Sequence, residues 1–483
     1  MIGVSLVLMV PGMVVSALLE WVDAHGDDEL PLLAAALFTL VIGTVARQGS
    51  SVERARTDPA SVFAAVAWTW VACSVAGALP YVFAGTFAHW DDAWFEAVSG
   101  FTATGSTVMA DIEANGRGLL MWRQLTQWYG GMGLVVLAVS VLPFLGVGGL
   151  GLISAEAPGP QADRLAPRVS DTARRLWAMY VGITAAIAAG LLACGLSLYD
   201  AVAHSFTAVA TGGFSPYNQS IGVYDSVAAE LVIVAGLIVS SISFTLHWRF
   251  LHRDWLAYAR SDECRAYLGI LAAAVAVIVV GNRIEGLGSV PTLLRHAVFN
   301  VATIASTAGF GNATGADSLG NFVLWSSAGQ MVLLLLLAVG GMAGSTAGGL
   351  KILRVLVTAR HSRREFAKYR HPRAVLPVTI DRTRVTDEIL SRTFGFILMF
   401  FTVTVVATMA LVAFGSDLVT SLSSVLTAMS GVGPGLGDTG PVSNFLAIAR
   451  PGRAVLAVVM LIGRLEIVAV LLMFVAPIRA LRR

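Results

Sequence analysis

Residues 102–106 of this chain read Thr-Ala-Thr-Gly-Ser, a loop of small side chains around one glycine. Three later stretches match it: Ala-Thr-Gly-Gly-Phe at 210–214, Ser-Thr-Ala-Gly-Phe at 306–310 and Ser-Gly-Val-Gly-Pro at 430–434. Each of these loops follows an apolar stretch. Four copies of one pattern in a single polypeptide predict four structural repeats, with their glycine loops gathered around one axis.

The composition excludes an ordinary soluble protein. Of the 483 residues, 56% are hydrophobic and only 13% are charged, whereas soluble globular proteins carry about 25% charged residues. Apolar stretches long enough to cross a bilayer, which takes about 20 residues, recur along the chain. The sequence therefore predicts an all-α polytopic membrane protein. The three cysteines lie far apart and indicate neither a disulfide framework nor a Cys-X-X-Cys metal site.

Ten apolar stretches are predicted to span the membrane. The first has no basic leader region and no convincing cleavage site, so we interpret it as a retained span rather than a signal peptide. The ten predicted spans are 1–22, 31–47, 61–86, 119–145, 176–196, 226–248, 266–281, 321–339 continuing through 350–360, 391–414 and 453–478.

Four shorter apolar segments lie within the last four pairs of spans, near 91–104, 199–212, 295–308 and 418–432. They are too short to cross the bilayer and are typical of re-entrant pore helices. The predicted fold is four units of span, pore helix, glycine loop and span around one central pore, after a two-helix hairpin. The predicted units are the hairpin 1–57 and the pore repeats 58–160, 161–260, 261–385 and 386–483, the third with an interrupted second span.

The distribution of charge predicts the orientation. Lysine and arginine cluster in every second predicted loop, whereas the loops between them carry acidic residues such as Asp23, Asp91 and Asp111. Because basic loops stay on the cytoplasmic side, we predict that both termini are cytoplasmic and that all four glycine loops face outward. The longest basic run, at 360–373, would contact anionic lipid of the bilayer or dock a cytosolic protein.

The glycine loops suit an ion filter, because a ring of backbone carbonyls can replace the water around a cation. Carbonyls turned toward one axis need unusual backbone dihedrals, which glycine adopts without a steric penalty. A short helix that ends at the ring also points the negative end of its dipole toward the cation. Ordinary glycine-rich turns or helix-packing positions are the alternative, but four loops at matching places favour a filter. The candidate filter residues are Thr104, Gly105, Thr211, Gly212, Gly213, Thr307, Ala308, Gly309, Val432 and Gly433.

The register of the second loop is ambiguous, because either Gly212 or Gly213 could be the filter glycine. Gly213 is preferred, since Gly213-Phe214 then matches Gly309-Phe310.

Residues 340–349 read Gly-Gly-Met-Ala-Gly-Ser-Thr-Ala-Gly-Gly in the middle of an apolar run. Five glycines in ten residues do not hold a stable helix. We predict a flexible loop that crosses the inner mouth of the pore and gates it, with close helix packing through small residues as the alternative. The candidate gate residues are Gly340, Gly341, Gly344, Ser345, Thr346, Gly348, Gly349, Lys351 and Arg464.

Arg464 is the last of these and lies within the final predicted span. A buried arginine in a span is costly and usually faces a cavity or a partner. We predict that it faces the pore, where it would repel cations or hydrogen-bond the carbonyls of the gate loop. The alternatives are a salt bridge with Glu466, whose side chain leaves the helix in a different direction, or extension of the side chain to the inner surface.

Nothing in the sequence predicts an enzyme or a nucleic-acid-binding protein. No nucleophile–base pair is readable, and the eight histidines show no metal-ligand spacing, so His204 and His296 are interpreted as capping or packing residues. The Gly-X-Gly-X-X-Gly pattern at 146–151 follows a predicted span instead of a strand, so it does not indicate a dinucleotide fold.

Taken together, the four glycine loops, the segment 433–438 (Gly-Pro-Gly-Leu-Gly-Asp), the loop 343–349 and the segment 463–466 (Gly-Arg-Leu-Glu) resemble the Trk/Ktr/HKT superfamily of potassium transporters. The resemblance covers nearly the whole chain. The hairpin before the first repeat makes it most similar to the bacterial TrkH-like membrane subunits. The fourth loop departs from the family pattern, because it lacks the threonine before its glycine.

The resemblance implies potassium uptake across the bacterial inner membrane, with K⁺ as the transported ion and a gate at 340–349 close to Arg464. It also implies a homodimer and a cytosolic ring of nucleotide-binding regulatory subunits of the TrkA type, with the nucleotide on that partner. The alternative is a secondary transporter that couples K⁺ to Na⁺ or H⁺ at a site between broken helices. That class often shows inverted repeats, whereas all four glycine loops here are predicted on one face.

Overall fold

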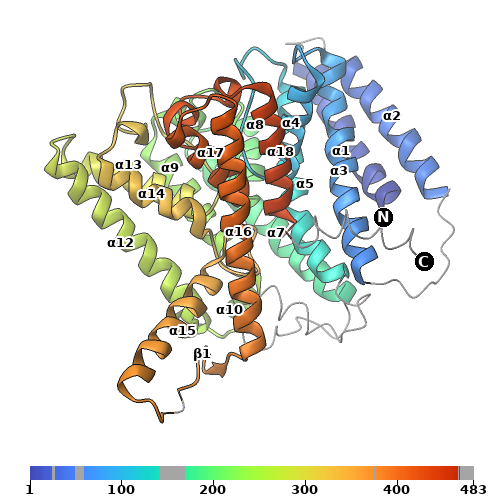
Figure 1. Cartoon of the computed structure of the whole chain (residues 1–483). Helices are drawn as coiled ribbons and strands as arrows, with labels where there is room; N and C mark the ends of the chain where they lie inside the picture. The colour runs from blue at the N-terminus through green and yellow to red at the C-terminus, as the bar shows by residue number, and fades with distance from the viewer. Residues whose placement is uncertain (24–27, 49–58, 142–168, 375, 466, 468–483) are drawn as a thin grey trace.

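The structure is a computed structural model of the whole chain, and it describes all residues except 24–27, 49–58, 142–168, 375, 466 and 468–483. It is almost entirely helical, which confirms the predicted fold class (Figure 1). Helices α1 (Ile2–Asp23) and α2 (Glu29–Gln48) pack on each other as the predicted N-terminal hairpin.

After the hairpin, the order long helix, short helix, loop, long helix occurs four times, and we number these units repeats 1 to 4. Repeat 1 contains α3 (Pro59–Ala84), α4 (Trp90–Phe101) and α5 (Arg117–Val141). Repeat 2 contains α7 (Val169–Ala193), α8 (Leu198–Val209) and α9 (Val227–Ser241). Repeat 3 contains α12 (Asp262–Ile284), α13 (Val290–Ala305) and α14 (Ser327–Val339). Repeat 4 contains α16 (Asp387–Ala413), α17 (Leu418–Ser430) and α18 (Arg450–Arg464).

The short helix of each repeat is the predicted pore helix. Ser197, Ser289 and Asp417 cap the first turns of α8, α13 and α17 by accepting backbone N–H bonds, as residues of these types do at helix starts. The acidic residues Asp92 and Asp200 lie in the first turns of α4 and α8, where the positive end of the helix dipole favours negative charge.

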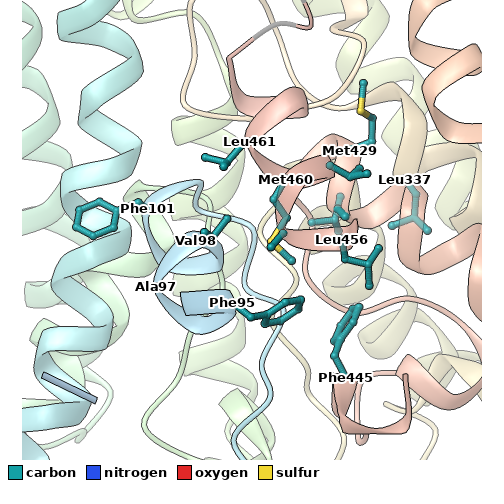
Figure 2. Packing of buried hydrophobic residues seen from close by; sticks show 14 of the residues in the cluster. Phe95, Ala97, Val98, Phe101, Leu337, Met429, Phe445, Leu456, Met460 and Leu461 are labelled. Carbon is teal, nitrogen blue, oxygen red and sulfur yellow. The ribbon is translucent and has the colours of Figure 1, made fainter. Parts of the chain in front are cut away.

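The four repeats close into a ring, because the last helix of each repeat packs on the pore helix of the next. Helix α5 contacts α8, α9 contacts α13, α14 contacts α17, and α18 contacts α4. Figure 2 shows the last of these contacts, where Phe95 and Val98 of α4 face Leu456 and Met460 of α18. A segment near the chain's C-terminus thus seals the ring against repeat 1.

Several helices are suited to a bilayer. Within the described residues, six are long and apolar enough to span it, namely α1, α2, α7, α12, α16 and the Phe63–Ala84 part of α3. Large apolar side chains such as Leu398, Val406 and Met409 on α16 are exposed, as side chains that contact lipid must be. Within the described residues, the other predicted spans correspond to α5, to α14 with α15 (Ile352–Arg370), to α18 and to a bent helix pair. Residues 142–145, 466 and 468–478 of the predicted spans 119–145 and 453–478 lie outside the described residues.

That bent pair corrects the prediction of a continuous span at 226–248. Helix α9 stops at Ser241, and α10 (Phe244–Leu251) leaves at an angle of 98°. The physical reason for the break is a tertiary contact with the loop 340–349. Met342 donates its backbone N–H to the Ser241 carbonyl (3.0 Å), and Phe244 donates to the Gly344 carbonyl (3.0 Å). These bonds satisfy backbone groups that the break would otherwise leave unpaired.

The remaining elements are short. Helix α15 projects from one end of the bundle together with a two-stranded ribbon that the sequence analysis did not predict (Figure 1). Buried side chains, including Leu353, Val378 and Leu390, pack α15, the ribbon and α16 together. The short elements are α11 (Ala257–Arg260), β1 (Thr379–Ile380), β2 (Thr383–Arg384), η2 (Ser220–Tyr224), η3 (Phe322–Leu324), η4 (Gly437–Thr439) and η5 (Phe445–Ala447).

Candidate functional site

The four glycine loops share one backbone conformation. Each has two residues with positive φ, separated by one residue. The second of each pair is a glycine, with φ of 85° at Gly105, 76° at Gly213, 80° at Gly309 and 103° at Gly433. This region of backbone space favours glycine. The first residues of the four pairs are Ala103, Thr211, Thr307 and Gly431.

The way that the pore helices end produces this conformation. The backbone N–H that follows the first left-handed residue bonds back to the carbonyl five residues earlier, as in a Schellman cap. These bonds run from Thr104 to Ser99, from Gly212 to Thr207, from Ala308 to Thr303 and from Val432 to Thr427, with N···O distances of 2.8–3.0 Å.

The shared conformation aligns the loops residue by residue. It pairs Gly213, and not Gly212, with Gly105, Gly309 and Gly433. It also pairs Thr211 and Thr307 with Ala103 and Gly431, whereas Thr104 lies one residue later. The fourth loop therefore differs from the second and third by a glycine at the first left-handed position.

The loops meet one another in cyclic order. A Cβ added to Gly105 would collide with the Gly212 carbonyl oxygen, one on Gly213 with the Ala308 oxygen, and one on Gly309 with the Val432 oxygen. The cycle closes at Gly433, where an added Cβ would lie 3.0 Å from the Thr104 oxygen. The structure thus brings all ten candidate filter residues into one ring of closely packed backbone. Within this ring, Gly105, Gly213, Gly309 and Gly433 have positive φ and little or no room for a Cβ.

The loop 340–349 lies directly against these loops, at the ends where they follow the pore helices. Gly348 donates its backbone N–H to the Thr307 hydroxyl (2.7 Å), and a Cβ added there would collide with the Ser430 carbonyl oxygen. The Thr346 hydroxyl is 3.0 Å from both the Val209 and the Ser240 carbonyl oxygens. The loop therefore contacts the loops or pore helices of repeats 2, 3 and 4.

Arg464 connects this loop to repeat 1. Its guanidinium donates to the Thr346 carbonyl oxygen (3.2 Å) and to the Gly130 carbonyl oxygen on α5 (3.0 Å). This geometry contains the hydrogen bond to a loop carbonyl that the sequence suggested, and the side chain also lines the cavity described next. Glu466, the alternative partner, lies outside the described residues.

One cavity lies between the glycine loops and the loop 340–349. Its lining includes one candidate filter residue, Thr104, and four candidate gate residues, Gly348, Gly349, Lys351 and Arg464, together with Phe396 of α16 and Met460 of α18. Lys351 also reaches this cavity, where its ammonium group donates a hydrogen bond to the Ala347 carbonyl oxygen. The lining residues are Thr102, Thr104, Ala347, Gly348, Gly349, Lys351, Phe396, Ser430, Gly431, Met460, Gly463 and Arg464.

Several buried polar residues at this site were missed by the sequence analysis. Arg123 and Glu96 form an ion pair of 2.7 Å, and both side chains are almost completely buried. Gln127 lies against the second filter loop. Glu263, at the start of α12, accepts the backbone N–H of Ala343 in the gate loop (2.7 Å). The available signal for Arg123 and Gln127 was the presence of charged and amide side chains inside a predicted span.

His204 lies inside the packed interior. His204 is buried, and its ring nitrogens lie 2.8 Å from the Asp200 carbonyl oxygen and 3.0 Å from the Ser215 hydroxyl. Among the residues that the structure describes, no group of three or more His, Cys, Asp or Glu side chains could hold a metal ion. The four loops themselves offer backbone carbonyl and hydroxyl oxygens and no carboxylates, and such oxygens suit a weakly held, mobile cation.

Comparison with known proteins agrees with this geometry. Residues 32–480 match the family model TrkH, described as a cation transport protein. The Trk system potassium uptake protein TrkH of Halomonas elongata is 38% identical over 85% of this chain and 84% of its own length. The protein of the same name from Escherichia coli K12 is 33% identical over 98% of this chain and 97% of its own length.

A solved structure shows the same fold. The crystal structure of the potassium transporter TrkH from Vibrio parahaemolyticus matches with a TM-score of 0.86 and 31% sequence identity, covering 97% of this chain and 96% of that one. These comparisons confirm the resemblance inferred from the loops. The chain therefore belongs to the TrkH family of cation transport proteins.

Proposed function

We propose that this chain takes up K⁺ across the bacterial inner membrane through the ring of four glycine loops. The observation that carries the proposal is the cyclic contact of four loops with one shared backbone conformation. A ring of this kind presents backbone carbonyls to one axis and can replace the hydration shell of a cation. Relatives over most of the chain are named potassium uptake proteins, which supports K⁺ as the ion.

The loop 340–349 is the gate in this proposal. It lies between the proposed filter and the inner end of the pore. Three hydrogen bonds hold it there: Arg464 donates to the Thr346 carbonyl oxygen, Ala343 donates to Glu263, and the Thr346 hydroxyl donates to the Val209 carbonyl oxygen. Opening would require these bonds to break. The positive charge of Arg464 beside the same cavity would also oppose cation entry while the gate is closed.

The proposed regulator is a cytosolic nucleotide-binding subunit of the TrkA type that binds near α15. This helix continues directly from the gate loop and projects from the bundle (Figure 1), so a force on α15 would reach the loop. The proposal further places both termini in the cytoplasm and the four loops outside, with two copies forming a homodimer. The repeat boundaries predicted from the sequence stay a proposal.

Growth of a bacterium that lacks its own K⁺ uptake systems tests the transport function. Expression of this chain with its regulatory subunit should restore growth at low external K⁺. Purified protein in liposomes should then conduct K⁺ without an imposed Na⁺ or H⁺ gradient. Dependence of the K⁺ flux on such a gradient would favour coupled transport, and failure to restore growth despite membrane expression would contradict the proposal.

A further inference from the structure

The second filter loop is held from behind by one side chain of repeat 1. Gln127 on α5 is completely buried. Its amide nitrogen donates to the Gly212 carbonyl oxygen (2.7 Å), and its amide oxygen accepts the backbone N–H of Phe214 (3.0 Å). The two bonds lie on either side of Gly213, so a single side chain fixes the backbone both before and after the filter glycine.

This contact also explains the double glycine of the second loop. Gly212 occupies the position of Thr104, Ala308 and Val432 in the other loops. A Cβ added to Gly212 would lie 2.5 Å from the amide carbon of Gln127. A side chain at 212 is therefore incompatible with the amide of Gln127 in its observed position.

A second residue of α5, one helical turn earlier, extends the support. Arg123 donates to the Ser215 carbonyl oxygen (2.9 Å), and its guanidinium carbon lies 3.5 Å from the centroid of the Phe214 ring. Its partner Glu96 accepts the backbone N–H of Val108 (2.9 Å) beyond the first filter loop. The network of Arg123, Glu96 and Gln127 thus ties the outer ends of loops 1 and 2 to one helix.

We propose that Gln127 is a positioning residue that determines the K⁺ over Na⁺ selectivity of the filter, an inference that rests on the proposed function. Discrimination between the two ions depends on how many carbonyl dipoles face the ion and how freely they move. A buried hydrogen-bond network in which both partners are satisfied makes its backbone rigid. Only a neutral amide supplies one donor and one acceptor here, because a carboxylate lacks the donor and an alkyl group lacks both.

Gln127→Leu is the first test, measured as the K⁺/Na⁺ flux ratio of purified protein in liposomes. The variant leaves the Gly212 oxygen and the Phe214 N–H without partners, and the ratio should fall by about three- to tenfold, the effect of losing one or two neutral hydrogen bonds. Gln124→Leu is the matched control. Gln124 lies on the same helix and is equally buried, and its amide has no hydrogen-bond partner within the described residues. The K⁺/Na⁺ flux ratio of Gln124→Leu should therefore stay within about twofold of the parent's ratio.

A double-mutant cycle covers the case in which Gln127→Leu fails to fold. Gly212→Ala should lower the ratio in the parent, because the new Cβ displaces the amide of Gln127. In a Gln127→Ala background there is no amide to displace, so Gly212→Ala should have little further effect, and the two changes should be clearly non-additive. Thermal unfolding of each variant separates loss of selectivity from loss of folding.

The outcomes distinguish the two proposals. Suppose that the parent protein conducts K⁺ and discriminates against Na⁺. A folded Gln127→Leu variant with the same K⁺/Na⁺ flux ratio, or an additive double-mutant cycle, would then overturn the role of Gln127 and leave the transport function intact. A parent that conducts no K⁺ would instead contradict the proposed function.

Discussion

Gly309 illustrates what a single residue contributes to the filter. Its φ of 80° and its contact with the Val432 carbonyl oxygen each exclude a side chain. Gly311, two residues later, has neither constraint, because a Cβ added there would lie 3.6 Å from its nearest neighbour, the Pro441 oxygen. The two glycines therefore form a matched pair for mutation.

Replacing Gly309 with serine should lower the K⁺/Na⁺ flux ratio by about tenfold, because the loop must move to admit the Cβ and the carbonyl ring is distorted. Gly311→Ser should leave the ratio nearly unchanged. The measurement is radiotracer uptake into liposomes that contain purified protein. Equal ratios for the two variants would show that Gly309 does not shape the ion path.

Arg464 is the second residue whose contacts predict a phenotype. Arg464→Ala removes two charge-assisted hydrogen bonds that hold the gate loop to α5. Such bonds contribute about 1.5–3 kcal/mol each, so basal K⁺ flux in the absence of the regulator should rise by about tenfold or more. The control is Arg450→Ala, because Arg450 forms an exposed ion pair with Asp91, and exposed ion pairs contribute little to stability. An unchanged basal flux in Arg464→Ala would remove this residue from the gate.

Among the helices, the interrupted span of repeat 3 carries the proposed gate. Its non-helical segment packs against the glycine loops and is the proposed gate, and its continuation α15 leaves the bundle (Figure 1). Deleting residues 344–348 should raise basal K⁺ flux by about tenfold or more, since the atoms that contact Thr307, Val209 and Ser430 are removed. A flux no higher than that of the parent would rule out a gating role for the loop.

The start of α12 gives an independent way to loosen the same loop. Glu263→Gln weakens the bond that its carboxylate accepts from Ala343, because a hydrogen bond to a charged group contributes about 1.5–3 kcal/mol and a neutral one about 1 kcal/mol. Basal flux should rise by a few-fold, less than for the deletion. Glu388→Gln on α16, where the carboxylate is exposed and pairs only with Arg392, should have no effect. A similar flux for both variants would show that Glu263 does not restrain the gate.

The elements that the sequence predicted well are those specified by local composition. The glycine loops, the pore helices and the break at 340–349 each follow from residues adjacent in the chain. The bend after Ser241 was missed because its unpaired backbone groups are satisfied by residues 342 and 344. Gln127 and Glu263 were missed for the same reason, since their partners lie 80 or more residues away. For Gln127, the one signal in the local sequence was the presence of polar side chains inside the predicted span that contains α5.

In the molecule as a whole, the contacts between repeats arrange the four units of one chain in a closed ring. Each repeat places its last helix on the next pore helix, and α18 completes the cycle against α4 (Figure 2). The loops carried by these helices meet in the same order. The sequence indicated four units, but their cyclic order and the alignment of Gly213 depended on tertiary contacts that no single repeat contains.

The central claim is that the four loops surround a single ion path. Crystals of the protein soaked in Rb⁺, which replaces K⁺ and scatters anomalously, test it most directly. Anomalous density should lie on the axis that Gly105, Gly213, Gly309 and Gly433 enclose. Rb⁺ density confined to sites outside this ring, in crystals where the ring itself is clearly ordered, would contradict it.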